Sequence, residues 1–252
     1  MTGELRPSAA RWLGVASIVA VLVAWEPACR FGAFTPVVLP APSSVLERLW
    51  FFMTDAQLRG QLALTLQRLA AGLALGITAG VVLGIAAASF RPTARMLEVF
   101  IGVLAPLPKI ALYPALLLTL GFASAPKIAL VAIESLFPIL IATSEAVALV
   151  DRRMLWSAAS MGTSRGRALH RVVLPACLPA IITGIRIGAV IACIVVLLAE
   201  MVASTNGLGY VLVIASRNFH TADMFVPIVI MSLIGFALDK LLGWLARRTN
   251  HA

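Results

Sequence analysis

Long apolar stretches divided by short polar ones run along the whole chain, and they predict helices that cross a membrane. A crossing α-helix needs about 20 mostly apolar residues, and residues 69–90 carry no charge at all. Residues 178–204 carry only Arg186 and Glu200. The pattern predicts an all-α integral membrane protein with six transmembrane helices, over residues 12–29, 62–90, 96–120, 126–149, 178–203 and 223–246.

Composition and charge support the membrane class. Of the 252 residues, 61% are hydrophobic and 12% are charged, which is about half the charged fraction of a soluble domain. The net charge of +9 would suit nucleic-acid binding, but Lys and Arg cluster between the apolar stretches, as the positive-inside rule describes. The sequence therefore predicts membrane lipid, and no nucleic acid, as a partner.

The distribution of Lys and Arg also predicts the orientation. With both termini in the cytoplasm, twelve basic residues lie on the inner side: Arg6, Arg11, Arg91, Arg95, Arg152, Arg153, Arg165, Arg167, Arg171, Lys240, Arg247 and Arg248. Six lie on the outer side or its margins: Arg30, Arg48, Arg59, Arg68, Lys127 and Arg217. We therefore expect a multi-pass protein with both termini cytoplasmic.

Three parts are expected along the chain: an N-terminal transmembrane helix (1–34), an outer interfacial helix with its loop (35–60), and a core with five transmembrane helices (61–248). In the second part, Ser43 or Ser44 is placed to cap a short helix. One face of that helix, formed by Val45, Leu46, Leu49 and Trp50, suits the membrane surface. A packed loop helix without a role in transport is the alternative.

Four glycines recur at every fourth residue of the second predicted helix: Gly72, Gly76, Gly80 and Gly84. On a helix they form one stripe, along which another backbone can approach closely. The stripe predicts tight packing with a helix of the same chain or of another chain.

The longest inner loop, residues 151–171, is predicted to form a helix, a turn and a second helix. Asp151 is placed to cap the first helix, and Gly162 permits the left-handed turn that often ends one. Pro175 and Pro179 are expected to punctuate the start of the fifth transmembrane helix.

Two interpretations of this loop are open from the residues alone. It is either a cationic loop on anionic lipid or a docking element for another protein. In the second case the small side chains of residues 158–160 enter a groove of the partner, and Arg165, Arg167 and Arg171 pair with acidic residues.

Residues 157–188, SAASMGTSRGRALHRVVLPACLPAIITGIRIG, resemble the cytoplasmic loop signature of ABC importer permeases: E-A-A, three residues, G, about nine residues, then I-x-L-P. Trp156 stands where the glutamate is usual. The resemblance implies that the ATPase-coupling residues are Trp156, Ser157, Ala158, Ala159, Gly162, Arg165, Arg167, Leu174 and Pro175.

Six further stretches, in order along residues 35–248, resemble the nitrate/sulfonate/taurine/bicarbonate branch of these permeases: residues 39–50, 65–85, 106–130, 137–140, 198–212 and 239–248. The resemblance implies a type I ABC importer permease fold in a bacterial inner membrane, with residues 151–171 as the coupling helix. It further implies a homodimer with a second permease copy, two cytoplasmic ATPase subunits, and a periplasmic or lipid-anchored solute-binding protein. The expected cargo is a small anion such as nitrate, a sulfonate, taurine, bicarbonate or an organic acid.

We expect a transport subunit and not an enzyme. The chain lacks the G-x-x-x-x-G-K-[ST] phosphate-binding motif, so ATP and magnesium are expected in the partner ATPase, and no cofactor is expected in this chain. Its three cysteines and three histidines are scattered, and their spacing predicts no metal site.

Ionisable side chains inside the predicted helices are candidates for a role in transport. Lys109, Glu134 and Glu200 are the pathway or gate candidates, with Glu200 placed to shape an outer gate together with residues 204–210. A structural ion pair between Lys109 and Glu134 is the alternative. Arg186 is expected to snorkel toward the inner surface.

Two other functions are weighed against the importer. An ion-gradient-coupled secondary transporter predicts an internal repeat with paired broken helices, which the sequence does not show convincingly. A non-transporting membrane assembly subunit predicts no stable complex with an ATPase.

Overall fold

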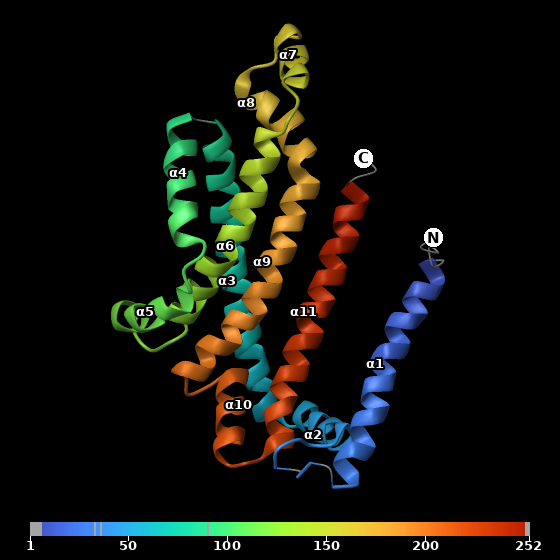
Figure 1. Cartoon of the computed structure of the whole chain (residues 1–252). Coiled ribbons are helices and arrows are strands. Elements are labelled where there is room, and N and C mark those ends of the chain that lie inside the picture. The colour runs from blue at the N-terminus through green and yellow to red at the C-terminus, as the bar shows by residue number, and fades with distance from the viewer. Residues whose placement is uncertain (1–6, 33, 36, 90, 250–252) are drawn as a thin grey trace. The chain divides into compact units, whose positions relative to one another are not determined.

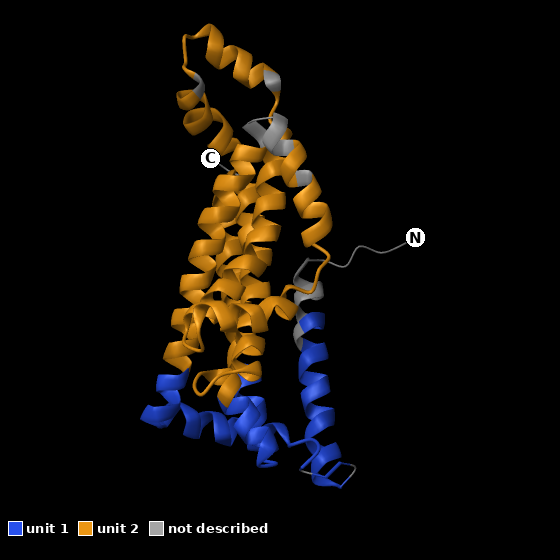
Figure 2. Ribbon diagram, turned by 90° about the vertical axis from the view of Figure 1, so that its left-hand side faces the viewer, with its two compact units in different colours: residues 1–61, 211–229 blue, residues 62–210, 230–252 orange. Residues whose placement is uncertain are grey.

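The computed structural model describes residues 7–32, 34, 35, 37–89 and 91–249, and these contain helices and no strand. They divide into two compact units (Figure 2). Unit 1 comprises residues 1–61 and 211–229, and unit 2 comprises residues 62–210 and 230–252. The helices are α1 (Pro7–Arg30), α2 (Pro42–Thr54), α3 (Ala56–Ser89), α4 (Arg91–Leu104), η1 (Lys109–Leu112), α5 (Tyr113–Leu120), α6 (Ala125–Ala148), α7 (Arg152–Ser160), α8 (Arg165–Ala168), the π-helical turn η2 (Leu169–Val173), α9 (Leu174–Val202), α10 (Leu208–Arg217) and α11 (Thr221–Thr249).

Four helical stretches of the described residues are long and apolar enough to cross a membrane: Ala56–Ala87, Ala125–Ala148, Gly166–Val202 and Thr221–Thr249. They correspond to the second, fourth, fifth and sixth predicted crossings. The helix α1 covers the first predicted crossing.

The third predicted crossing, residues 96–120, is not one straight helix. Its two halves, Arg95–Leu104 and Lys109–Leu120, meet at an angle of 88°. Pro106 and Pro108 lie in the break. Proline has no N–H to donate and its ring collides with the preceding helical turn, so two prolines this close together favour the break.

Pro175 and Pro179 behave differently: Pro175 marks the start of the fifth crossing, as predicted, whereas Pro179 lies within it. Pro175 occupies the first turn of α9 and Pro179 lies inside it, while the helical stretch runs unbroken from Gly166 to Val202. The wider π-helical turn η2 precedes Pro175 directly. In such a wider turn, the proline ring no longer collides with the backbone carbonyl of the preceding helical turn.

In unit 2, α3, α6 and α9 run side by side (Figure 1). The predicted glycine stripe of α3 faces α6, a helix of the same chain. A Cβ atom built on Gly72 would lie 2.6 Å from Val131, one on Gly80 would lie 2.9 Å from Ile139, and one on Gly84 would lie 2.6 Å from Thr143. These spacings leave no room for a methyl group, so the two backbones are in close contact.

In unit 1, α2 packs with only part of its predicted apolar face. Val45 and Phe52 are buried, whereas Leu46 and Trp50 are exposed. The expected serine cap is also absent, because Ala41 precedes the helix and the backbone N–H and hydroxyl of Ser43 both donate to Glu26 of α1. The α1 helix thus supplies the acceptor that the serine was expected to provide.

The close contact between α3 and α6 predicts that one methyl group has opposite effects at two glycines of α3. Gly72→Ala should lower the free energy of unfolding by about 1–3 kcal/mol through overpacking. Gly60→Ala, where nothing lies within 4 Å, should raise it by up to about 1 kcal/mol through helix propensity. Thermal unfolding in detergent measures both, and a stabilising Gly72→Ala would contradict the packing.

Candidate functional site

The predicted helix–turn–helix of residues 151–171 forms as α7 and α8. The Asp151 carboxylate accepts a hydrogen bond of 2.8 Å from the backbone N–H of Arg153, which confirms the predicted cap. Gly162 has φ +74°, the left-handed conformation that glycine favours. It follows Met161 at the end of α7 and turns the chain toward α8.

The small residues of α7 do not all face outward. Ala158 is only 3% exposed, so the expectation that it enters the groove of a partner is wrong. Its side of α7 is covered by the same chain, because α7 packs on α8 and η2. Ser157 and Ala159 are exposed, and Trp156 is 68% exposed.

An apolar cluster fixes α7 to the membrane helices. Val173, Cys177 and Ile181 form its buried centre at the junction of η2 and α9. Leu155 of α7 and Val147 of α6 pack against that centre. The helix α7 is therefore connected through apolar contacts to the ends of both α6 and α9.

The remaining coupling candidates lie along the same segment. Arg167 is exposed, and the side chain of Arg165 lies outside the described side chains. Leu174 packs against the apolar cluster, while Pro175 is exposed in the first turn of α9. The described surface of this segment is thus cationic and apolar, and Trp156 is its largest exposed side chain.

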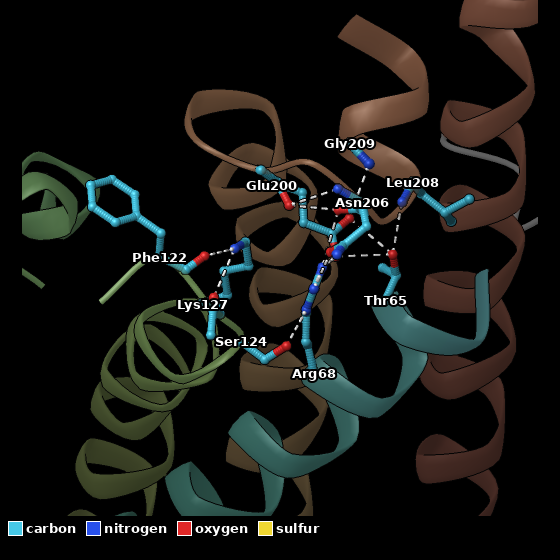
Figure 3. A network of polar contacts seen from close by, with 11 residues as sticks. Thr65, Arg68, Phe122, Ser124, Lys127, Glu200, Asn206, Leu208 and Gly209 are labelled. Atoms are coloured by element: carbon cyan, nitrogen blue, oxygen red, sulfur yellow. Dashed lines mark hydrogen bonds and ion pairs between the residues drawn. The ribbon is translucent and has the colours of Figure 1, made fainter. Parts of the chain in front are cut away.

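A second polar site, formed in unit 2 around a buried ion pair, is shown in Figure 3. Arg68 of α3 and Glu200 of α9 are 3% and 1% exposed, and Nη1 of Arg68 lies 2.6 Å from Oε1 of Glu200. The Thr65 hydroxyl donates to both carboxylate oxygens at 2.9 and 3.0 Å. The backbone N–H of Gly209 donates to Oε2 at 3.0 Å.

The same groups hold the loop between α9 and α10. Arg68 donates to the backbone carbonyl of Asn206 at 3.2 Å and also bonds the side-chain oxygen of that residue. The backbone N–H of Leu208 donates to the Thr65 hydroxyl at 2.9 Å. Glu200 therefore contacts the loop with which it was predicted to act, directly at Gly209 and also through Thr65 and Arg68 of α3.

Sequence reasoning placed Arg68 and Lys127 on the outer side or its margins, and in the structure both side chains are buried. Arg68 is paired with Glu200, and Lys127 is 1% exposed with its ammonium donating to the carbonyls of Phe122 and Ala123 at 3.3 and 2.9 Å. One sequence signal could have indicated a buried polar site here: Thr65 and Arg68 are polar residues one helical turn apart near the start of a predicted apolar helix.

Lys109 and Glu134 form the ion pair that was one of the two interpretations, with Nζ and Oε2 separated by 3.5 Å. The Lys109 ammonium also donates to the carbonyl of Ala105 at 3.1 Å and lies 4.5 Å from the centroid of the Phe137 ring. Lys109 is 7% exposed. The pair joins the break of the third crossing to α6.

Arg186, which was predicted to snorkel toward the inner surface, has a partner on α11. Its guanidinium forms two hydrogen bonds with the carboxylate of Asp239 on α11, of 2.5 and 3.0 Å. Asp239 was missed because the two residues are 53 positions apart in sequence. A paired carboxylate removes the need for the arginine to reach water.

Nothing in these sites resembles a catalytic centre. The described residues contain no group of three or more His, Cys, Asp or Glu side chains that could hold a metal ion. The three cysteines are buried free thiols.

Comparison with known proteins gives a consistent set of relatives. Residues 76–251 match the sequence model of the family described as binding-protein-dependent transport system inner membrane component. The putative aliphatic sulfonates transport permease protein SsuC of Escherichia coli is 31% identical over 246 residues, covering 96% of this chain and 92% of that protein. The taurine transport system permease protein TauC of Escherichia coli is 30% identical over 242 residues, covering 94% and 88%.

Among solved structures, a chain of the MetNI methionine ABC transporter in an inward-facing conformation superposes with a TM-score of 0.58. The match covers 84% of this chain and 98% of that one, with 14% sequence identity. At this low sequence identity, the superposition shows that the two chains share a fold and nothing more.

The buried pair predicts a large and specific loss of stability when Glu200 alone is neutralised. Glu200→Gln should cost about 3–5 kcal/mol, since it leaves the guanidinium of Arg68 buried without a counter-charge. Arg186→Gln breaks a partly exposed pair and should cost about 0–1 kcal/mol. Removing both buried charges, Arg68→Met with Glu200→Met, should recover most of the loss in thermal unfolding. Equal losses from the two single variants would show that the buried pair has no special role.

Proposed function

The chain belongs to the family of binding-protein-dependent transport system inner membrane components, and on that basis we propose that it forms the pathway for a small anionic solute. Members of this family are multi-pass permease subunits of ATP-driven ABC importers. ATP hydrolysis takes place in a separate ATPase subunit, and a solute-binding protein delivers the cargo. A gradient-driven transporter and an assembly subunit do not fit this membership.

The main structural support for an importer subunit is the way α7 is attached to the membrane helices α6 and α9. We propose that α7 and the turn at Gly162 dock on the ATPase, with Trp156, Ser157 and Ala159 on the docking face. Support comes from their exposure and from the apolar cluster that joins α7 to α6 and α9. Trp156, in the position where glutamate is usual, would insert an aromatic ring into an apolar part of the ATPase groove.

The orientation proposed is that both termini lie in the cytoplasm. In this orientation six basic residues lie on the outer side or its margins, against twelve on the inner side. The C-terminal end of α11, which carries Arg247 and Arg248, lies toward the same end of unit 2 as α7 (Figure 1). This is the end at which a cytoplasmic ATPase would bind.

We further propose that two copies of the chain form the pore as a homodimer. One face of α4, with Met96, Val99, Phe100 and Val103, is apolar and exposed in the single chain. These residues recur at helical spacing on one side of α4, as expected of a helix that meets lipid or a second copy.

For the cargo we propose an anion of the sulfonate kind. The relatives named above are a putative aliphatic sulfonates permease and a taurine permease. The proposed pathway and gate residues are Lys109 and Glu134 at the break of the third crossing, and Glu200 with its loop at the outer end. Nitrate, bicarbonate and organic acids are the other anions considered.

Docking through α7 predicts a sharp contrast between two exposed glycines. Gly162→Val forces a side chain into the left-handed region, which costs roughly 1–2 kcal/mol, and should reduce ATPase association and ATP-dependent uptake about 5- to 30-fold. Gly166→Val meets nothing within 4 Å and has no positive φ, so it should be close to wild type.

The measurement uses the permease co-expressed with its ATPase, purified and reconstituted with the binding protein in liposomes. Co-purified ATPase and uptake are recorded for both variants, with and without ATP at a constant proton gradient. Uptake that continues without ATP would contradict the importer, and equal behaviour of the two variants would contradict docking through α7.

A further inference from the structure

Aromatic and basic side chains alternate along one side of α11 near its C-terminal end, within unit 2. Phe236, Lys240, Trp244 and Arg248 follow one another at every fourth residue, a spacing that places them in one row on a helix. All four are exposed, with Phe236 at 61% and Trp244 at 43%. We call this row the aromatic–basic stripe.

Each basic group of the stripe lies over the ring that precedes it by one turn. Nζ of Lys240 lies 5.0 Å from the centroid of the Phe236 ring, and Cζ of Arg248 lies 4.0 Å from that of the Trp244 ring. A ring covers only one side of a cation and does not neutralise its charge. In the part of the chain that the structure describes, neither Lys240 nor Arg248 forms an ion pair with a carboxylate. Both cations therefore keep N–H groups with which to bind an anion.

The adjoining side of α11 packs against α9. Asp239, which directly precedes Lys240, accepts two hydrogen bonds from the guanidinium of Arg186 on α9. A Cβ atom built on Gly243 would lie 3.3 Å from Cζ of Arg186. The carboxylate nearest to the stripe in sequence therefore has another partner, and the positive charge of the stripe stays unbalanced.

The stripe lies where α11 would leave the hydrocarbon core of a membrane. This core is about 30 Å thick, which a helix spans in about 20 residues at a rise of about 1.5 Å per residue. Counted from Thr221 at the start of α11, the inner boundary of the core falls close to Lys240. Arg248 then lies about 12 Å further along the helix axis, and Trp244 lies between them, at the interfacial depth that tryptophan favours.

We propose that the aromatic–basic stripe binds an anionic phospholipid of the inner leaflet. Lys240 and Arg248 bracket the headgroup phosphate, because two long side chains can close over the distance between them, and the acyl chains run along Phe236 and Trp244. The phosphate supplies the counter-charge that a cation at the edge of the hydrocarbon core requires. The site rests on the orientation proposed above. Its lipid would fix the inner end of α11 at the level where Asp239 joins that helix to α9.

The test titrates lipid into the detergent-purified permease–ATPase complex and counts the bound lipids by native mass spectrometry. The anionic lipid is dioleoylphosphatidylglycerol, and dioleoylphosphatidylcholine is the neutral lipid with the same chains. One Lys or Arg near a membrane surface contributes about fivefold to the affinity for anionic lipid. With two such residues, phosphatidylglycerol should bind with a Kd roughly 25-fold lower than that of phosphatidylcholine. If no ATPase co-purifies, the importer itself is contradicted, and the same titration on the permease alone still tests the stripe.

Matched variants separate the stripe from the general charge of this helix end. Lys240→Gln and Arg248→Gln should each raise the Kd for phosphatidylglycerol about fivefold, while Lys240→Arg should retain wild-type binding. Arg247→Gln removes the same charge beside Arg248 but lies off the stripe, in the row of Asp239 and Gly243, so it should change the Kd by less than about twofold.

Three results would overturn the site. Equal affinities of the wild type for the two lipids would mean that the stripe does not select an anionic headgroup. Equal losses in Arg247→Gln and Arg248→Gln would indicate attraction to the basic helix end in general. Loss of the ATPase from Lys240→Gln or Arg248→Gln, with the lipid preference unchanged, would assign the stripe to the ATPase interface.

Discussion

The close packing of α6 between two other helices is the constraint on which the core of this protein depends. Glycines of α3 meet it on one side, and Gly184 and Gly188 of α9 meet it on the other. Ile139 lies opposite both Gly80 and Gly188, and Ser135 lies opposite both Gly76 and Gly188. Lipid offers no hydrophobic force to hold helices together, so such backbone contact has to supply much of their association through dispersion and close fit. The backbones of the three helices are thereby in close contact.

This three-helix body connects the proposed docking site on α7 with the proposed gate around Glu200. At one end the apolar cluster around Cys177 attaches α7 to α6 and α9. At the other end Arg68 and Glu200 join α3 to α9 and hold the following loop. A displacement of α7 would be transmitted along packed helices, because a close-packed interior has little compressibility. Between the two ends, the third crossing is interrupted by the bend at Pro106 and Pro108.

Local signals in the sequence were sufficient for features that a single segment determines. The spacing of Gly72 to Gly84, the cap at Asp151 and the turn at Gly162 each follow from neighbouring residues and were read from them. Pairings across long separations were not readable: Glu200 meets Arg68 from 132 positions away, and Asp239 meets Arg186 from 53. Proline had opposite effects in different helices, because the third crossing is broken at Pro106 and Pro108 whereas α6 and α9 continue past Pro138 and Pro179. The burial of Ala158 likewise depends on how α7 packs on α8 and η2, and the residues of α7 alone do not reveal this packing.

The most direct test of this account is a pair of spin-label distances in the permease–ATPase complex, recorded without nucleotide and with a non-hydrolysable ATP analogue. Labels at Ser160 on α7 and Ile194 on α9 occupy exposed positions of unit 2. The account predicts that the Ser160–Ile194 distance within one copy stays constant while the Ser160–Ser160 distance between copies shortens when the analogue binds. A change within the copy, with no change between copies, would mean that α7 moves independently of the membrane helices and would contradict coupling through a rigid body.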